Sequence, residues 1–152
     1  MTEEETFYKL SALCASSEHC LHEMSEKMRR WGTPYDEQQR ILERLVGEKF
    51  IDEERYSRAF VADKLNYNKW GRMKIRQALA MKRIPDETAE AALNEIDDEE
   101  YIAILKPLIK AKRKSVKAAS DYELNGKLIR FAMGRGFTMD VIRECLPEGD
   151  ID

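Results

Sequence analysis

Two cysteines and two histidines lie within nine residues near the start of this 152-residue sequence, and these residue types can hold a metal ion. They are Cys14, His19, Cys20 and His22. Zinc sites usually join one closely spaced ligand pair to a second pair farther along the chain, and no second pair follows here. We therefore expect no metal site and interpret Cys20 as a small packing residue at a helix start. A ligand-responsive sensor built on this cluster is an alternative hypothesis, which metal analysis of the purified protein tests.

Catalytic motifs are missing from the sequence. It contains no nucleophile elbow, no zinc-protease helix motif and no phosphate-binding loop of the Walker type. The acidic run at 97–100 falls where a helix is expected to begin, and the helix dipole favours carboxylates there without catalysis. Gly134 and Gly136 could form a phosphate-binding turn, but a helix end and turn explains them more simply. We predict that the chain is not an enzyme and has no catalytic residue and no cofactor.

Charge is sorted along the chain, although the net charge is only -3. Residues 64–83 hold seven basic and no acidic residues, whereas residues 84–100 hold eight acidic and no basic residues. Residues 101–120 again hold six basic and no acidic residues. Solvated helix faces that sort by sign are one interpretation. The interpretation that we favour is two basic surfaces that meet an anionic partner.

The basic residues that we expect to contact this partner lie on two predicted helices. On the helix at 71–82, Ile75 and Leu79 face inward, which places Arg72 and Arg76 on an outer face. On the helix at 98–114 and its tail, basic residues recur at helical spacing away from the apolar stripe. Arg72 and Arg76 rank first because arginine makes bidentate contacts with carboxylates and phosphates. The candidate partner-binding residues are Arg72, Lys74, Arg76, Lys82, Arg83, Lys106, Lys110, Arg113 and Lys117.

Hydrophobic periodicity and helix-end signals predict helices along the whole chain and no strand. The predicted helices span residues 4–15, 20–31, 36–47, 52 to about 67, 71–82, 86–96, 98–114, 120–134 and 138–146. Pro107 should kink the seventh helix or mark a boundary, and Pro147 should end the ninth. We interpret Trp70 as a core residue. The fourth helix is expected to be capped by Asp52 and to bury Tyr56, Ala59, Phe60 and Tyr67.

A repeat slightly longer than fifty residues organises these helices. Gly32, Arg83 and Gly136 occupy equivalent positions, 51 and 53 residues apart. Matching apolar or small residues precede them by four and eight positions, namely Met24 and Met28, Ile75 and Leu79, and Leu128 and Ala132. The prediction is an all-α chain of three tandem three-helix modules, at residues 1–48, 49–97 and 98–152, which form an elongated, curved array.

Composition limits where the protein can act. No apolar run is long enough to cross a membrane, and the acidic N-terminus lacks the features of a signal peptide. Three cysteines, an odd number, do not suggest a disulfide framework. We therefore expect a cytoplasmic protein without a membrane partner, and we expect it to be a monomer.

Three stretches of the sequence together resemble the RecX regulators of the RecA recombinase. The central stretch, residues 51–56, is followed by Ala59, Phe60 and Val61 and by Gly71, Arg72, Ile75 and Leu79. The first stretch comprises Glu18, His19, Cys20, Glu23, Met24, Lys27 and Met28. The last comprises Arg130, Phe131, Arg135, Gly136, Phe137, Val141, Ile142 and Leu146. Each motif is loose, but their order and spacing are specific. One departure is Arg83, where the family usually has glycine.

The resemblance implies a regulator that acts by binding. RecX proteins bind RecA, lie along the groove of its nucleoprotein filament and limit filament growth. They thereby reduce strand exchange, ATP hydrolysis and co-protease activity, and so bear on homologous recombination, DNA repair and the SOS response. The alternative is a helical protein that binds DNA directly without RecA, because three-helix modules with a basic face can dock on duplex DNA. A weak direct DNA contact could also accompany RecA binding.

Overall fold

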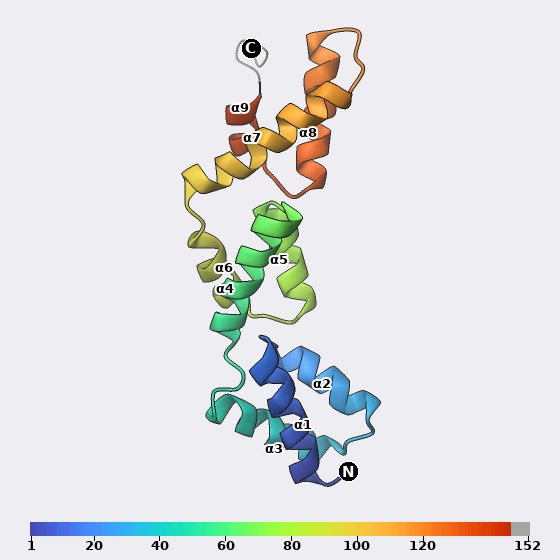
Figure 1. The fold of residues 1–152 in the computed structure, drawn as a ribbon, viewed down its shortest axis with the longest axis vertical. Helices are drawn as coiled ribbons and strands as arrows, with labels where there is room; N and C mark the ends of the chain where they lie inside the picture. Colours follow the sequence, from blue (N-terminus) through green and yellow to red (C-terminus); the bar gives the residue numbers. More distant parts are fainter. Residues whose placement is uncertain (147–152) are drawn as a thin grey trace. The chain divides into compact units, whose positions relative to one another are not determined.

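The computed structural model describes residues 1–146, and this part of the chain is helical without any strand (Figure 1). The all-α prediction is therefore confirmed. The expectation for Pro147 lies outside the described residues. Within the described range the elements are α1 (Glu3–Ser16), α2 (Leu21–Arg30), α3 (Tyr35–Gly47), α4 (Glu53–Asp63), the π-helical turn η1 (Lys64–Asn68), α5 (Arg72–Met81), α6 (Asp86–Asn94), α7 (Asp98–Ser115), α8 (Asp121–Gly134) and α9 (Met139–Cys145).

The chain divides into two compact units. The first unit combines Met1–Phe60 with Leu79–Ala89, and the second combines Val61–Ala78 with the described residues from 90 onward. Helices α4, α5 and α6 each contribute residues to both units. This division does not test the three modules expected from the repeat, at 1–48, 49–97 and 98–152, and those boundaries stay a prediction.

Helices α1, α2 and α3 surround the core of the first unit. α3 packs against both α1 and α2, as the ribbon in Figure 1 shows. This packing buries one apolar stripe from each helix, which stabilises helices that are too short to persist alone. The buried members of the cluster are Phe7, Leu10, Met24, Met28, Ile41, Leu45 and Ile51.

Helices α7, α8 and α9 pack against one another in the second unit. Pro107 lies inside α7, which continues through it to Ser115, so this proline marks no boundary. The side chain of Pro107 is exposed, and water can reach the carbonyl that loses its helical N–H partner there. The apolar residues that these helices bury are Tyr101, Leu105, Ile109, Leu128, Ala132, Val141 and Ile142.

The ends of α2, α5 and α8 share one backbone conformation. The angle φ is 74° at Gly32, 58° at Arg83 and 100° at Gly136. After each of them, the next residue donates its N–H to a carbonyl five residues earlier, in the pairs Thr33 to Met28 (3.0 Å), Ile84 to Leu79 (3.1 Å) and Phe137 to Ala132 (3.1 Å). This is the Schellman motif, in which the left-handed residue is usually glycine. The predicted equivalence of the three positions is confirmed.

The buried face of α4 and η1 differs from the prediction. Tyr56 is buried, but Ala59 is exposed and Tyr67 is 82% exposed. The inward positions are held by Tyr56, Ser57, Val61 and Leu65. Ser57 interrupts the apolar pattern of this face in the sequence because serine is polar. Its hydroxyl donates to the Glu53 carbonyl at 2.7 Å, so the side chain can be buried without losing a hydrogen bond.

Candidate partner-binding surface

Arg72, at the start of α5, is held by contacts within the second unit. Its Nη2 donates to the Ile96 carbonyl at 3.2 Å and lies 3.5 Å from Oδ1 of Asp98. Its guanidinium carbon is 4.2 Å from the centroid of the Tyr101 ring, and 29% of the side chain is exposed. Arg72 therefore ties α5 to the α6–α7 junction. The sequence had placed it free on an outer face, and the structure corrects this.

The backbone of Arg72 reinforces this link. Its N–H donates to the Tyr101 hydroxyl at 2.8 Å, which satisfies one of the amide groups at the start of α5. Burial raises the pKa of the Tyr101 hydroxyl, and the bond from Arg72 opposes this only in part. Tyr101 therefore stays protonated and serves as a structural hydrogen-bond partner.

Two further candidates on or next to α5 are paired within their own unit. In the second unit, Nη2 of Arg76 lies 2.6 Å from Oε2 of Glu90. In the first unit, Nζ of Lys82 lies 3.2 Å from Oε2 of Glu23. Arg83 is exposed and adopts the left-handed conformation. To bind a partner, Arg76 and Lys82 would have to exchange an internal carboxylate for a group of that partner.

The most exposed positions of α5 hold Met73, Gln77, Ala80 and Met81, and none of them is an arginine. Met73 is 43% exposed and Met81 is 80% exposed, whereas Arg72, Lys74 and Arg76 are only partly exposed on the flanks. The inward stripe of Ile75 and Leu79 was predicted correctly, and both are fully buried. The periodicity located the buried side of α5, but the arginines do not occupy the side opposite to it.

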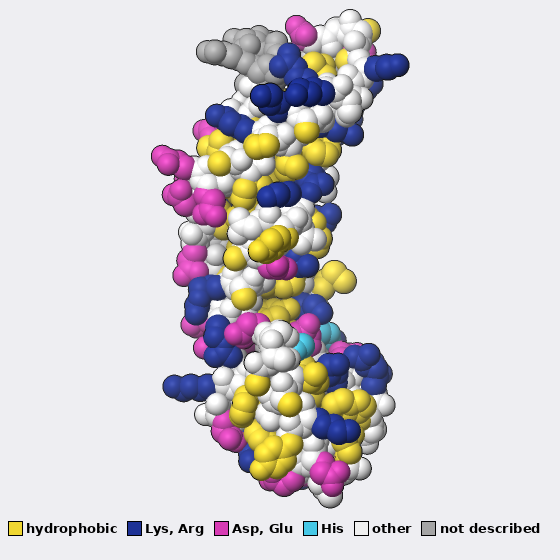
Figure 2. Space-filling model, viewed as in Figure 1, with side chains coloured by type: hydrophobic (Ala, Val, Ile, Leu, Met, Phe, Trp, Pro, Cys, Tyr) yellow, Lys and Arg dark blue, Asp and Glu magenta, His cyan; other side chains and the backbone are white. Residues whose placement is uncertain are grey.

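Lys106, Lys110 and Arg113 form an exposed row on α7, here called the α7 basic row. Their spacing of four and three residues places them on one helix face. Within residues 1–146 none of the three pairs with a carboxylate. Figure 2 shows Lys and Arg side chains gathered around the end of the chain that holds α7 and α8. The α7 basic row therefore has charges available for an anionic partner.

Lys117 does not extend this row along the helix. α7 ends at Ser115, so Lys117 lies in the segment between α7 and α8. Its side chain is exposed, and its carbonyl accepts a bond from Nζ of Lys127 at 2.7 Å. The predicted row at helical spacing thus stops at Arg113.

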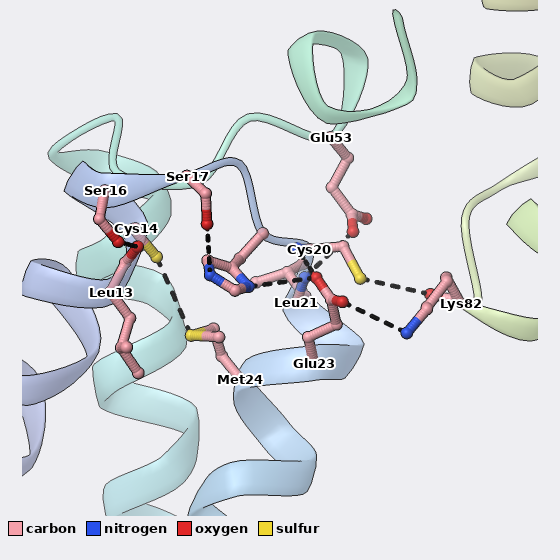
Figure 3. Close-up of polar contacts among 11 residues, drawn as sticks. Leu13, Cys14, Ser16, Ser17, Cys20, Leu21, Glu23, Met24, Glu53 and Lys82 are labelled. Atoms are coloured by element: carbon pink, nitrogen blue, oxygen red, sulfur yellow. Dashed lines mark hydrogen bonds and ion pairs between the residues drawn. The ribbon is translucent and has the colours of Figure 1, made fainter. Parts of the chain in front are cut away.

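The side chains of Cys14 and Cys20 point toward different partners (Figure 3). Sγ of Cys20 faces the Lys82 carbonyl at 3.8 Å, and Sγ of Cys14 faces Sδ of Met24 at 3.9 Å. The His19 ring lies 3.3 Å from a carboxylate oxygen of Glu23. In the described part of the chain, no three or more His, Cys, Asp and Glu residues are grouped so that they could hold a metal ion.

Cys20 is a packing residue at the start of α2, as predicted. Its side chain is fully buried, and burial raises the pKa of its thiol to about 11. A thiol in this state is neutral at physiological pH and a poor nucleophile.

Residues 52–55 make capping bonds and an ion pair within the first unit. Asp52 accepts two backbone N–H bonds at the start of α4, each 3.0 Å long, which confirms its predicted capping role. Glu53 accepts the N–H of Leu21 at 3.1 Å and so caps α2 from a distant part of the sequence. Arg55 forms an ion pair with Glu18. No sequence pattern pointed to the bond between Glu53 and Leu21.

Every helix described here is too short or too polar to cross a lipid bilayer. This agrees with the absence of long apolar runs in the sequence.

Comparison with known proteins assigns the fold and its repeats. Residues 52–93 match the second three-helix domain of RecX, and residues 98–146 match the third three-helix domain of RecX. A crystal structure of regulatory protein RecX is 20% identical and has a TM-score of 0.86, over 94% of this chain and 72% of that chain. At this identity the structural match establishes a common fold.

Curated relatives establish the family. Regulatory protein RecX of Prosthecochloris aestuarii is 30% identical over 132 residues, which cover 86% of this chain and 84% of the relative. Regulatory protein RecX of Lactobacillus delbrueckii subsp. bulgaricus is 30% identical over 117 residues, which cover 74% of this chain. The chain thus belongs to the RecX family. It spans only 43% of the length of the Lactobacillus relative.

Proposed function

We propose that this chain regulates a RecA recombinase by binding it and its filament on single-stranded DNA. Binding limits filament growth and thereby lowers ATP hydrolysis, strand exchange and co-protease activity. Membership of the RecX family, with its three-helix domains at 52–93 and 98–146, is the observation that carries this proposal. The protein acts as a non-catalytic monomer in the cytoplasm, in homologous recombination, DNA repair and the SOS response.

The α7 basic row is the first choice for the contact with the filament. Its three cations are exposed and have no carboxylate partner among residues 1–146, so they lose little when they bind an external anion. Arg72, Arg76 and Lys82 would first have to give up internal partners. We therefore place Lys106, Lys110 and Arg113 ahead of the arginines that the sequence ranked first. Lys74, Arg83 and Lys117 remain secondary candidates.

A RecA ATPase assay on single-stranded DNA tests the proposed function. The full chain, added in amounts well below that of RecA, should lower the steady-state rate of ATP hydrolysis. The effect should be larger when the chain is present during filament assembly than when it is added to complete filaments. An unchanged rate at equimolar protein would contradict the proposal.

Direct binding of duplex DNA without RecA is the second candidate, and the α7 basic row is the observation that favours it. Phosphate contacts release counterions, so such binding should weaken steeply as salt rises. Inhibition of RecA that persists at salt concentrations where duplex binding is lost would favour the recombinase contact.

A further inference from the structure

Two aromatic rings of the second unit are each accompanied by two cationic side chains. The ammonium groups of Lys64 and Lys74 lie 5.2 and 4.7 Å from the ring centroid of Trp70. Near Phe131, Nζ of Lys112 lies 5.2 Å from the ring centroid and the guanidinium carbon of Arg135 lies 5.8 Å from it. Trp70 and Phe131 are both half-buried, so each residue keeps some surface open to solvent, and Trp70 is not the core residue that the sequence predicted.

Arg135 connects these two groups. Its Nε donates to the Lys69 carbonyl at 3.1 Å, and its Nη2 donates to the Asn68 carbonyl at 2.6 Å. These carbonyls belong to the two residues directly before Trp70, while the same guanidinium lies near Phe131. The Arg135 guanidinium therefore links the backbone just before Trp70 to the Phe131 ring, although Trp70 and Phe131 are 61 residues apart in the chain. We call the two rings and their cations the aromatic–cation surface, which consists of Lys64, Trp70, Lys74, Lys112, Phe131 and Arg135.

The backbone holds this surface in a defined geometry. The N–H of Gly71 donates to the Arg135 carbonyl at 2.7 Å. A Cβ atom on Gly71 would lie 2.3 Å from the carbonyl carbon of Gly136, so the two chain segments touch without an intervening side chain. A binding site held in this way loses little conformational freedom when a ligand arrives.

Three cations of this surface, Lys74, Lys112 and Arg135, have no carboxylate partner within the described residues. The nearby acids Glu90 and Asp98 are directed to Arg76 and Arg72. A cation near an aromatic ring keeps its full charge, so these groups can still attract an external anion.

We propose that the aromatic–cation surface binds a single-stranded nucleic acid. Bases would stack against the open parts of Trp70 and Phe131, while backbone phosphates would meet the flanking cations. Unpaired bases stack on aromatic side chains with little regard to sequence, and basic groups follow the strand beside them. An acidic protein surface would need the cations but not the two rings, and a duplex keeps its bases inside the helix. This contact goes beyond the proposed binding of RecA and requires no recombinase.

Fluorescence of Trp70 tests the proposal without altering the surface. The chain contains two tryptophans, so Trp31→Phe leaves Trp70 as the only tryptophan. Titration with an oligothymidylate, in the absence of any recombinase, should quench its emission to saturation. A duplex of equal length should quench it far less. Absence of quenching at low salt would overturn the proposal.

Binding of a fluorescently labelled oligothymidylate, followed by anisotropy, assigns the roles of the rings and cations. Trp70→Ala should weaken binding about tenfold, because one stacking contact is lost. The double variant Lys74→Ala, Lys112→Ala should make the fall of log K with log salt shallower by about 1.4. Each phosphate contact with a single strand contributes about 0.7 to that slope, and two contacts are lost. Tyr122→Ala, at a 91% exposed aromatic residue, and Arg58→Ala, at an exposed cation of α4, are matched controls that should bind like the parent.

The same variants separate this proposal from the proposed function. Loss of oligothymidylate binding with unchanged inhibition of RecA would support the present inference and leave the other intact. Oligothymidylate binding equal to that of the parent in both variants would overturn it. A second result would also overturn it. If the parent chain binds no oligothymidylate and the variants nevertheless lose RecA inhibition, the surface contacts protein. If circular dichroism shows that Trp70→Ala does not fold, the lysine variants and the Trp70 titration still decide the outcome.

Discussion

Gly71 and Gly136 bring two chain segments of the second unit into direct backbone contact. The N–H of Gly71 donates to the Arg135 carbonyl at 2.7 Å, and the N–H of Met73 donates to the Gly136 carbonyl at 3.0 Å. The turn after α8 thereby satisfies amide groups at the start of α5 that have no partner within the helix. Gly136 also has a φ of 100°, which side chains rarely permit. The second unit therefore requires the absence of a side chain at both positions.

Gly71→Ala should destabilise the protein strongly. The added Cβ would lie 2.3 Å from the carbonyl carbon of Gly136, so the backbones must separate and weaken the bonds between them. We expect a loss of at least about 2 kcal/mol in the free energy of unfolding, measured by urea denaturation. Gly47→Ala is the control, because a Cβ there meets nothing within 4 Å. It should leave stability unchanged or raise it by up to about 1 kcal/mol. Equal stabilities of the two variants would refute the steric argument.

Leu79→Ala should cost about 2–5 kcal/mol, because it removes a large buried side chain and leaves a cavity. The Leu79 side chain is fully buried, with an exposed fraction of 0%. Met81→Ala, on the same helix at 80% exposure, should change stability by less than about 0.5 kcal/mol. Thermal and urea unfolding of both variants measure the difference. Similar losses in the two would show that the burial pattern of α5 is wrong.

Charge reversal of the α7 basic row should separate binding from folding. The triple variant Lys106→Glu, Lys110→Glu, Arg113→Glu should keep its helical circular dichroism, because all three side chains are exposed. It should inhibit RecA at least about tenfold less well, which corresponds to about 1.4 kcal/mol. Glu87→Lys, at an exposed position of α6, is the control and should inhibit like the parent. Full inhibition by a folded triple variant would rule out this surface.

Arg72 and Arg76 should differ in their effect on stability. Arg72→Ala removes a charge-assisted bond to the Ile96 carbonyl and a contact with Tyr101, so we expect a loss of about 1–3 kcal/mol. Arg76→Ala breaks an ion pair with Glu90 in which both side chains are substantially exposed, so it should cost about 0–1 kcal/mol. Urea unfolding of the two variants measures both values. An Arg72 variant as stable as the Arg76 variant would restore the outer-face prediction for Arg72.

Acid should remove the stabilisation that Glu23 contributes. Burial acts to raise the pKa of Glu23, but the N–H of Cys20 and the ammonium group of Lys82 outweigh it and bring the pKa below the ordinary value of 4.5. The contribution is therefore present above that ordinary value and disappears as pH falls through the lower folded-state pKa.

The change in urea midpoint between pH 6 and pH 3 measures this effect. Glu23→Gln should start less stable and lose less stability on acidification than the parent. Glu43→Gln, at an exposed residue of α3, should follow the parent curve. If Glu23→Gln and the parent lose stability in parallel, Glu23 makes no such contribution.

Local sequence signals were sufficient for the helices and for the repeat. Asp52 caps α4 as expected, and Gly32, Arg83 and Gly136 share a left-handed conformation even though the middle residue is not glycine. Capping and apolar spacing act over one or two turns, so the sequence displays them directly. The buried positions of Met28, Leu79 and Ala132 follow from the same short-range pattern.

Long-range partners could not be predicted in this way. The sequence marked Arg72 and Arg76 as equivalent exposed cations, but Ile96 and Tyr101 hold the first, whereas the second lies on the surface with Glu90. Ser57 is polar but fully buried, because its hydroxyl donates to the Glu53 carbonyl within its own helix.

Helical structure, a repeat slightly longer than fifty residues and the sorting of charges into blocks can all be read from the sequence. Those properties depend on residues within a few helical turns of one another. The folded structure is needed to show which cations are paired internally and which are open to solvent. It also shows that Arg135 links the carbonyls just before Trp70 to the Phe131 ring. Such contacts join residues from 14 to 67 positions apart in the chain, and no local periodicity records which of them will meet.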